Sequence, residues 1–118
     1  MRRAAVGPNG RRVVTTADNG KLQIWDVATG ELVQSIEHRD RIEYLQFSPD
    51  GHRLVAACYN GDVHVWNCTT GRRTCPVLKH HARVRLAEFS PDGMRIVTVQ
   101  DGGLARVWAA ASGVQIGS

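Results

Sequence analysis

An all-β fold built from repeated sheets is the fold class that this sequence of 118 residues predicts, and three observations predict it. Three copies of one pattern lead from a turn region with a proline to a tryptophan, which always lies 18 residues after the residue that precedes the proline. The tryptophans, Trp25, Trp66 and Trp108, are 41 and 42 residues apart. Each copy also consists of short alternating or apolar runs separated by turn residues. A period of about 40–45 residues with four short strands is typical of the blades of a β-propeller.

The second copy shows the expected strands most clearly. Residues 42–47 alternate between apolar and polar side chains, which predicts a strand with one buried face. A Ser-Pro-Asp-Gly sequence follows at residues 48–51 and has the composition of a type I turn. Residues 53–58 are then almost continuously apolar, which is typical of a strand covered on both faces.

A tight turn and two more strands complete each copy. An Asn-Gly pair at residues 60–61 predicts a two-residue hairpin turn, in which both residues take positive φ. The next strand covers residues 63–66, and a fourth strand is expected near residues 73–78. The other copies have Asn-Gly at residues 19–20 and Gly-Gly at residues 102–103. No stretch keeps a helical apolar period without an interrupting turn signal.

The repeats divide residues 1–118 into three blades, at about residues 1–36, 37–78 and 79–118. The first blade lacks part of its first strand and the last blade stops within its fourth, so we expect about 2.75 four-stranded antiparallel blades. A closed propeller uses about 4–8 blades. The sequence therefore predicts an open arc, or a fragment of a larger propeller, with two outer blade faces that lack a covering neighbour.

Composition and charge argue against a membrane protein and against a nucleic-acid-binding protein. The net charge is +4, but the 13 arginines are scattered among 11 acidic residues, so a solvated surface is favoured over a nucleic-acid groove. No apolar run approaches the ~18 residues that cross a membrane. No apolar segment of a secretion signal follows the basic residues 1–3. A cytoplasmic protein is expected.

The three cysteines, Cys58, Cys68 and Cys75, are an odd number and include no Cys-x-x-Cys pair. We interpret them as reduced thiols. A disulfide between two of them stays open as the less favoured alternative, because reducing compartments disfavour it.

Four short segments of the third copy resemble a known family. They are Leu-Lys-His at 78–80, Phe-Ser-Pro-Asp-Gly at 89–93, Arg-Ile-Val-Thr at 95–98 and Ala-Arg-Val-Trp at 105–108. With the repeat pattern they resemble the WD-repeat (WD40) β-propeller family over essentially the whole chain, and they are especially similar to repeats of large bacterial members.

The resemblance implies a buried tetrad in each blade: a histidine before the first strand, a hydroxyl residue in the second, an aspartate in the tight turn and the tryptophan of the third. The corresponding residues are Thr15, Asn19 and Trp25 in the first blade, His38, Asn60 and Trp66 in the second, and His80, Thr98 and Trp108 in the third. No tetrad is complete, because Ala56 replaces a hydroxyl residue and Gly102 an aspartate. Without the charge-assisted His–Asp hydrogen bond, we expect softer blades than the family pattern implies.

Motifs that would indicate catalysis or metal binding are incomplete. A His-Arg-Asp triplet at residues 38–40 matches the kinase catalytic loop, but Ile42 and Leu45 replace the lysine and asparagine that should follow. Cys75 and the histidine pair at 80–81 lack the four closely spaced ligands of structural zinc. A Gly-x-Ser-x-Gly nucleophile motif is also absent from the sequence. We expect no enzyme activity, no metal and no cofactor.

The remaining candidate site is a surface. In the resembled family, the loop before the first strand and the tight turn after the second open on the same rim, where partners usually dock. On that rim the resemblance places Arg39, Asp40, Arg41, Tyr59, Asp62, His81, Arg83 and Asp101. Arginine and tyrosine are favoured interface anchors. We therefore expect a non-catalytic scaffold that binds an acidic protein or peptide partner.

Two alternatives come from other functional classes. Uncovered blade faces would let copies of the chain, or further blades, associate laterally into a ring. The arginine excess would alternatively serve nucleic-acid binding, with a steep dependence on salt. The sequence favours the first of these alternatives over the second.

Overall fold

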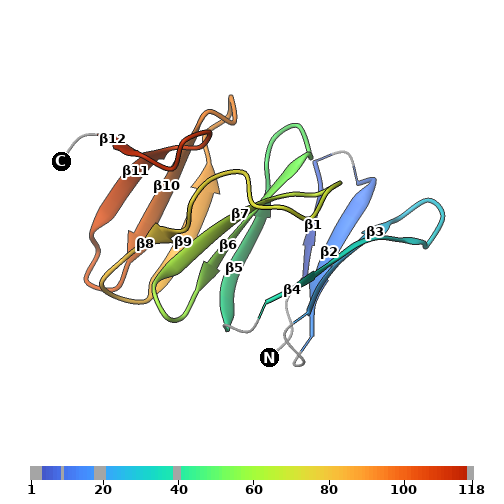
Figure 1. Cartoon of the computed structure of the whole chain (residues 1–118), viewed down its shortest axis with the longest axis horizontal. Helices are drawn as coiled ribbons and strands as arrows, with labels where there is room; N and C mark the ends of the chain where they lie inside the picture. Colours follow the sequence, from blue (N-terminus) through green and yellow to red (C-terminus); the bar gives the residue numbers. More distant parts are fainter. Residues whose placement is uncertain (1–3, 9, 18–20, 39–40, 117–118) are drawn as a thin grey trace.

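The computed structural model describes residues 4–8, 10–17, 21–38 and 41–116. These residues form three four-stranded antiparallel sheets that stand in one row (Figure 1). The strands are β1 (Ala4–Val6), β2 (Arg12–Thr16), β3 (Lys21–Asp26), β4 (Leu32–Glu37), β5 (Ile42–Phe47), β6 (Arg53–Cys58), β7 (Asp62–Asn67), β8 (Leu78–Lys79), β9 (Val84–Phe89), β10 (Arg95–Gln100), β11 (Ala105–Ala109) and β12 (Gln115–Ile116). The prediction of an all-β chain of four-stranded propeller blades is thereby confirmed.

Within each sheet the strands follow one another in chain order as a meander. The first strands β1, β5 and β9 lie next to each other, so the sheets pack along one line. The loops and turns gather at two ends of the sheets, the proximal rim and the distal rim. The proximal rim has the loops that lead into β5 and β9 and the turns β6–β7 and β10–β11. The distal rim has the turns β1–β2, β5–β6 and β9–β10 and the loops that leave β3, β7 and β11.

The Pro-Asp-Gly turns of the second and third sheets are closed by the same contacts. The Gly51 amide donates to the Ser48 carbonyl at 2.9 Å, and the Ser48 hydroxyl donates to Asp50 Oδ1 at 2.6 Å. Asp92 receives the matching bond from Ser90 at 2.6 Å. In both turns the serine hydroxyl holds the pKa of the aspartate below its usual value. The turn predicted from composition is therefore built from serine and aspartate as well as from proline.

The tight turn between β6 and β7 differs from the predicted two-residue form. Gly61 has a φ of +95°, but no described residue other than glycine has a positive φ, so Asn60 does not take the expected conformation. The Gly61 amide donates to the Cys58 carbonyl at 3.2 Å, and Ala57 pairs with Val63. The loop is thus longer than predicted, with a turn over residues 58–61 that ends in Gly61 in the left-handed region.

The fourth strand of the middle sheet is also shorter than predicted. Only Leu78 and Lys79 form β8, and an isolated bridge joins Arg73 to Trp66 further along β7. Pro76, which lies between these two points, has no amide hydrogen to donate to the ladder. The pairing with β7 is therefore interrupted where a continuous strand was expected.

Two hydrophobic clusters fill the spaces between the sheets. One joins the first sheet to the middle sheet and includes Leu22, Ile24 and Leu54, and the other joins the middle sheet to the third. The two faces of β6 contribute to different clusters, and five of its six residues are buried. This confirms the prediction of a strand covered on both faces.

Polar contacts reinforce the junction between the middle and third sheets. The Tyr44 hydroxyl donates to Glu88 at 2.9 Å, and the Phe89 amide donates to Gln46 Oε1 at 2.8 Å. The Arg53 guanidinium lies 5.0 Å from the centre of the Phe89 ring. These two sheets are therefore joined by directional contacts as well as by apolar packing.

The outer sheets are less covered than the middle one. Large apolar side chains that are exposed lie mainly on the first and third sheets and their loops: Val6, Val27, Leu32, Met94, Leu104, Val114 and Ile116. All three cysteines are buried and none forms a disulfide. The described residues include no helix that is long and apolar enough to cross a membrane.

Candidate functional site

Three of the predicted rim residues meet at one point of the proximal rim. The guanidinium of Arg83 lies 4.8 Å from the centre of the Tyr59 ring, and that of Arg41 lies 5.3 Å from it. Arg41 precedes β5, Tyr59 follows β6, and Arg83 precedes β9, so the group bridges two sheets. Guanidinium groups at this distance are attracted by the negative face of an aromatic ring. We call Arg41, Tyr59 and Arg83 the Arg–Tyr–Arg group.

The buried carboxylate of Glu43 forms ion pairs with both arginines of the Arg–Tyr–Arg group. Its carboxylate Oε1 lies 3.0 Å from an Arg83 Nη atom and 3.6 Å from Arg41 Nε, and its side chain is only 6% exposed. Strand β5 has an irregular register between Ile42 and Tyr44, which allows Glu43 to turn inward. The alternating sequence pattern gave no signal for this residue, because strict alternation would place it outside.

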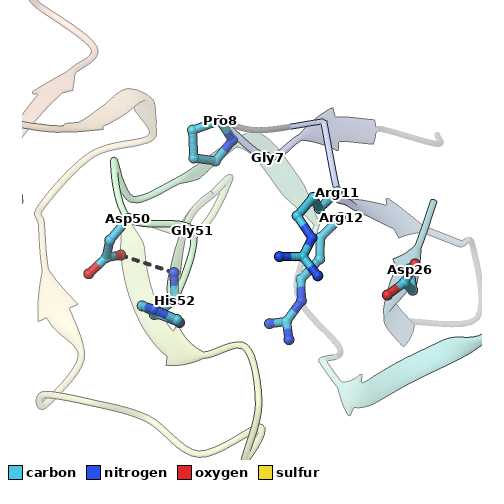
Figure 2. Close-up of a pocket in the computed structure, with 8 residues that line it drawn as sticks. All are labelled: Gly7, Pro8, Arg11, Arg12, Asp26, Asp50, Gly51 and His52. Atoms are coloured by element: carbon cyan, nitrogen blue, oxygen red, sulfur yellow. Dashed lines mark hydrogen bonds between the residues drawn. The ribbon is translucent and has the colours of Figure 1, made fainter. Parts of the chain in front are cut away.

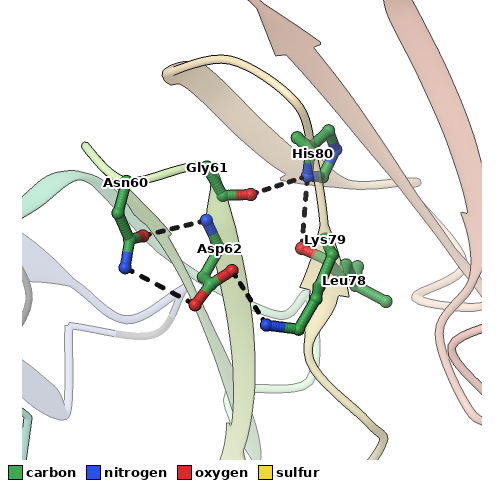
Figure 3. Close-up of polar contacts among 6 residues, drawn as sticks. All are labelled: Asn60, Gly61, Asp62, Leu78, Lys79 and His80. Atoms are coloured by element: carbon green, nitrogen blue, oxygen red, sulfur yellow. Dashed lines mark hydrogen bonds and ion pairs between the residues drawn. The ribbon is translucent and has the colours of Figure 1, made fainter.

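The other predicted rim residues form separate pairs or lie apart. Asp62 lies 3.6 Å from Lys79 Nζ and also contacts the side-chain amide of Asn60 (Figure 3). Asp101 forms an ion pair with Arg85, a residue that the sequence did not single out, and its amide donates to the Arg83 carbonyl at 2.8 Å. His81 is exposed. Arg39 and Asp40 lie outside the described residues.

In the third sheet, one chain of hydrogen bonds joins three residues of the expected tetrad. His80 Nδ1 lies 3.0 Å from the Gly61 carbonyl and 3.2 Å from the Leu78 carbonyl, so it must donate its proton (Figure 3). Burial lowers the pKa of His80, which favours the neutral ring. His80 Nε2 then accepts from the Thr98 hydroxyl at 2.7 Å, and the Thr98 oxygen accepts from Trp108 Nε1 at 3.0 Å.

The chain of hydrogen bonds also connects neighbouring sheets, because Gly61 belongs to the β6–β7 turn of the middle sheet. The His80 backbone amide donates to the same Gly61 carbonyl at 3.0 Å. The Gly61 carbonyl thus accepts one hydrogen bond from the backbone amide of His80 and one from its side chain. A close approach of this kind leaves no room for a side chain at position 61, where a Cβ atom would lie 2.7 Å from the His80 carbonyl oxygen.

The tetrad positions of the other two sheets are occupied differently. In the first sheet Trp25 Nε1 donates to Thr15 Oγ1 at 3.1 Å, while Asn19 lies outside the described residues. In the middle sheet the ring centres of His38 and Trp66 are 5.3 Å apart in an edge-on arrangement. The Asn60 side chain accepts from the Asp62 amide at 3.0 Å and so caps its own turn.

A hollow lies on the distal rim, between the first and middle sheets (Figure 2). It has a volume of about 290 Å³, and its charged lining is balanced, with Arg11 and Arg12 against Asp26 and Asp50. Asp26 accepts from the Ala28 amide and Asp50 accepts from the His52 amide, each at 2.9 Å. The hollow therefore offers no clear preference for an anion or a cation. The sequence gave no signal for it, because its residues come from separate repeats.

Solved structures include proteins of similar fold. The chain is similar to the β-propeller domain of Cps50 (Swd1) from Myceliophteria thermophila, with a TM-score of 0.83 and 21% identity over 96% of this chain and 35% of that one. It is also similar to the computationally designed Ika4 protein, with a TM-score of 0.80 and 26% identity over 92% of this chain and 66% of that one. The chain thus spans about a third of the first structure and just under two thirds of the second.

The sequence comparison places the repeats in a family. A search of curated proteins gave no match. The family described as WD40 (WD domain, G-beta repeat) matches residues 2–26, 30–67 and 72–109. Each matched segment ends with the third strand of a sheet, and the second and third segments begin before the fourth strand of the preceding sheet. These segments contain the turns and the three tryptophans on which the predicted repeat was based. The chain therefore belongs to the WD40 family of β-propeller repeats.

Proposed function

We propose that the chain is a non-catalytic protein-interaction module that binds acidic peptide segments of a partner through the Arg–Tyr–Arg group of the proximal rim. The observation that supports this most strongly is the position of Tyr59, which is 49% exposed and has two guanidinium groups beside its ring. Tyrosine and arginine together supply a large contact area and directional donors, and such residues dominate binding energy at interfaces.

The charges of the Arg–Tyr–Arg group favour an acidic partner. Two guanidinium groups share one buried carboxylate, that of Glu43, so these three side chains together are positively charged. Arg41 is the more exposed arginine, with 52% of its side chain accessible, whereas Arg83 is 28% accessible. A carboxylate of a partner can bind a guanidinium through two parallel hydrogen bonds.

The group is also held in place before any partner arrives. The Glu43 carboxylate pairs with both arginines and the ring of Tyr59 lies against them, so the freedom of these side chains is already reduced before binding. Preorganised contacts of this kind raise affinity by lowering the entropic cost of association. The strands directly next to the three residues, β5, β6 and β9, belong to the packed middle and third sheets.

Tyr59→Ala tests the proposed binding surface. We expect the wild-type chain to bind short acidic synthetic peptides in preference to neutral or basic ones of equal length. The substitution should weaken the binding of the acidic peptides by about thirtyfold, which corresponds to the ~2 kcal/mol of a central aromatic anchor. Fluorescence anisotropy with labelled peptides measures this change.

The double substitution of Arg72 and Arg73 by alanine is the control. Both residues are exposed and lie in the loop after β7, at the distal rim, so this variant loses more positive charge than Tyr59→Ala without altering the proposed surface. Acidic-peptide affinity should stay nearly unchanged. If the control weakens binding as much as Tyr59→Ala does, general charge attraction explains the binding and the proposed surface is wrong. Tighter binding of single-stranded DNA, with a steep dependence on salt, would instead favour the nucleic-acid alternative.

A second candidate function is lateral association into a larger ring, and the distribution of exposed apolar residues favours it. The middle sheet is covered on both faces, while the outer sheets expose side chains such as Val6 and Met94, each 67% accessible. Stacking of further blades on these sheets would bury such surface.

Light scattering at several concentrations distinguishes lateral association from the peptide-binding function. A discrete dimer or trimer that dissociates on dilution is the expected result of lateral association. A monomer at all concentrations, or aggregates of mixed size, would contradict it.

A further inference from the structure

A buried group of possible metal ligands lies in the middle sheet, just inside the proximal rim. It consists of His38, which follows β4, Cys58 at the end of β6, and His64 in β7. One nitrogen or sulfur atom from each residue lies within 4.8 Å of the others. Their exposed fractions are 7%, 0% and 4%. Imidazole nitrogen and cysteine sulfur are the ligand types that zinc prefers.

The neighbouring sheet shows why these side chains converge. In the third sheet Thr98 lies between His80 and Trp108 and bonds to both. The same register position in the middle sheet is Ala56, which is fully buried and has no hydroxyl group. His64 lies directly opposite Ala56 on the adjacent strand, so its imidazole faces the space that the small side chain leaves.

The rings and the sulfur atom are close enough for one ion to join them. The ring centres of His38 and His64 are 4.7 Å apart, and His38 Nε2 lies 3.1 Å from Cys58 Sγ. Zinc bonds of ~2.0–2.3 Å in tetrahedral geometry separate neighbouring ligand atoms by about 3.5 Å. Small side-chain rotations would therefore bring all three atoms to bonding distance.

The chemistry of the three ligands selects the class of ion. The group contains no carboxylate, so calcium and magnesium, which require oxygen ligands, are disfavoured. A thiolate with two imidazoles suits a borderline-soft ion, and three protein ligands leave a fourth position for another donor.

We propose that His38, Cys58 and His64 form a zinc-binding site. The bound ion would join the loop between the first and middle sheets to β6 and β7 of the middle sheet, at the position where the third sheet has the hydroxyl of Thr98. Because Tyr59 directly follows Cys58, the ion would also steady the start of the turn that carries the aromatic residue of the Arg–Tyr–Arg group. The site does not depend on the proposed partner binding.

The test is a titration of the chelator-treated 118-residue chain with Zn²⁺ in competition with a coloured chelator. We expect the chain to bind one equivalent of Zn²⁺. Cys58→Ser should weaken binding by about a hundredfold or more, because loss of a direct ligand exceeds the ~10–100-fold loss seen for outer-shell partners. Co²⁺ bound in place of Zn²⁺ should give the near-ultraviolet absorption of a thiolate–cobalt bond.

Matched variants identify the ligands. Cys68→Ser and Cys75→Ser remove the other buried thiols, and His81→Gln removes an exposed imidazole; all three should bind Zn²⁺ as the wild type does. Failure of the folded wild-type chain to bind Zn²⁺, undiminished binding by Cys58→Ser, or a cobalt complex without thiolate absorption would each overturn the proposal. If circular dichroism shows that Cys58→Ser does not fold, the wild-type cobalt spectrum decides whether a thiol binds, and the two other cysteine variants show by exclusion which one.

Discussion

Thr98→Val is expected to lower the free energy of unfolding by about 3 kcal/mol. Valine matches threonine in shape but lacks the hydroxyl that accepts from Trp108 Nε1 at 3.0 Å and lies 2.7 Å from His80 Nε2. Thr98 is fully buried and Trp108 is 7% exposed, so neither lost bond is replaced easily by water. Each buried polar group that is left without a partner costs about 1–3 kcal/mol. Urea unfolding followed by tryptophan fluorescence measures the change.

Thr15→Val is the matched control in the first sheet. Thr15 Oγ1 accepts one bond, from Trp25 Nε1 at 3.1 Å, and both side chains are only partly buried. The expected loss is about 1 kcal/mol, the net contribution of one hydrogen bond that water can partly replace. Equal losses in the two variants would show that the hydroxyl of Thr98 does not bridge His80 and Trp108.

Gly61→Ala should destabilise the chain by a similar amount, about 3 kcal/mol. A φ of +95° is strained for alanine, and the added Cβ would lie 2.7 Å from the His80 carbonyl oxygen and 3.0 Å from that of Ala82. These are backbone atoms, which cannot rotate away as the end of a flexible side chain can. The β6–β7 turn and the His80 loop would be forced apart, and a fall in the thermal unfolding midpoint measures the cost.

Gly102→Ala separates the two causes. Gly102 has the same φ of +95°, but nothing lies within 4 Å of the Cβ position. The variant therefore has the backbone strain without the steric contact, and we expect a loss of about 1 kcal/mol. If the two glycine variants lose equal stability, the close approach between the middle and third sheets contributes nothing to the effect.

The repeat could be predicted from the sequence because its signals are local. The Ser-Pro-Asp-Gly turn at residues 48–51 and the apolar run at 53–58 act through backbone geometry and burial within a few residues. Fixed spacing to the tryptophans then shows that the same local unit is used three times. These features determine the fold even though no tetrad matches the family pattern completely.

Features that depend on register or on contacts between sheets could not be predicted in the same way. Glu43 turns inward at a register shift of β5, which an alternating sequence pattern does not predict. His64 approaches His38 because it lies opposite Ala56, which becomes evident only once β6 and β7 are paired. Asn60 keeps a negative φ because the loop is one residue longer than the dipeptide suggests.

The candidate surface was predictable as a region but not as an arrangement. The resemblance placed Arg41, Tyr59 and Arg83 on one rim, since loops that open at the same end of a sheet are neighbours. Their meeting around a single ring, above the buried carboxylate of Glu43, depends on how the middle and third sheets pack. That packing is a property of two blades together, and one repeat contains no information about it.

The bonds from His80 to the Gly61 carbonyl mean that the third blade is tied to the turn of the blade before it. Stability in such a row passes from neighbour to neighbour, as in other repeat proteins, and not through one common core. In the 118-residue chain, fraying should begin at the outer sheets, each of which packs against one other sheet of the chain. Amide hydrogens of β6 and β7 would then be the last in the chain to exchange with solvent.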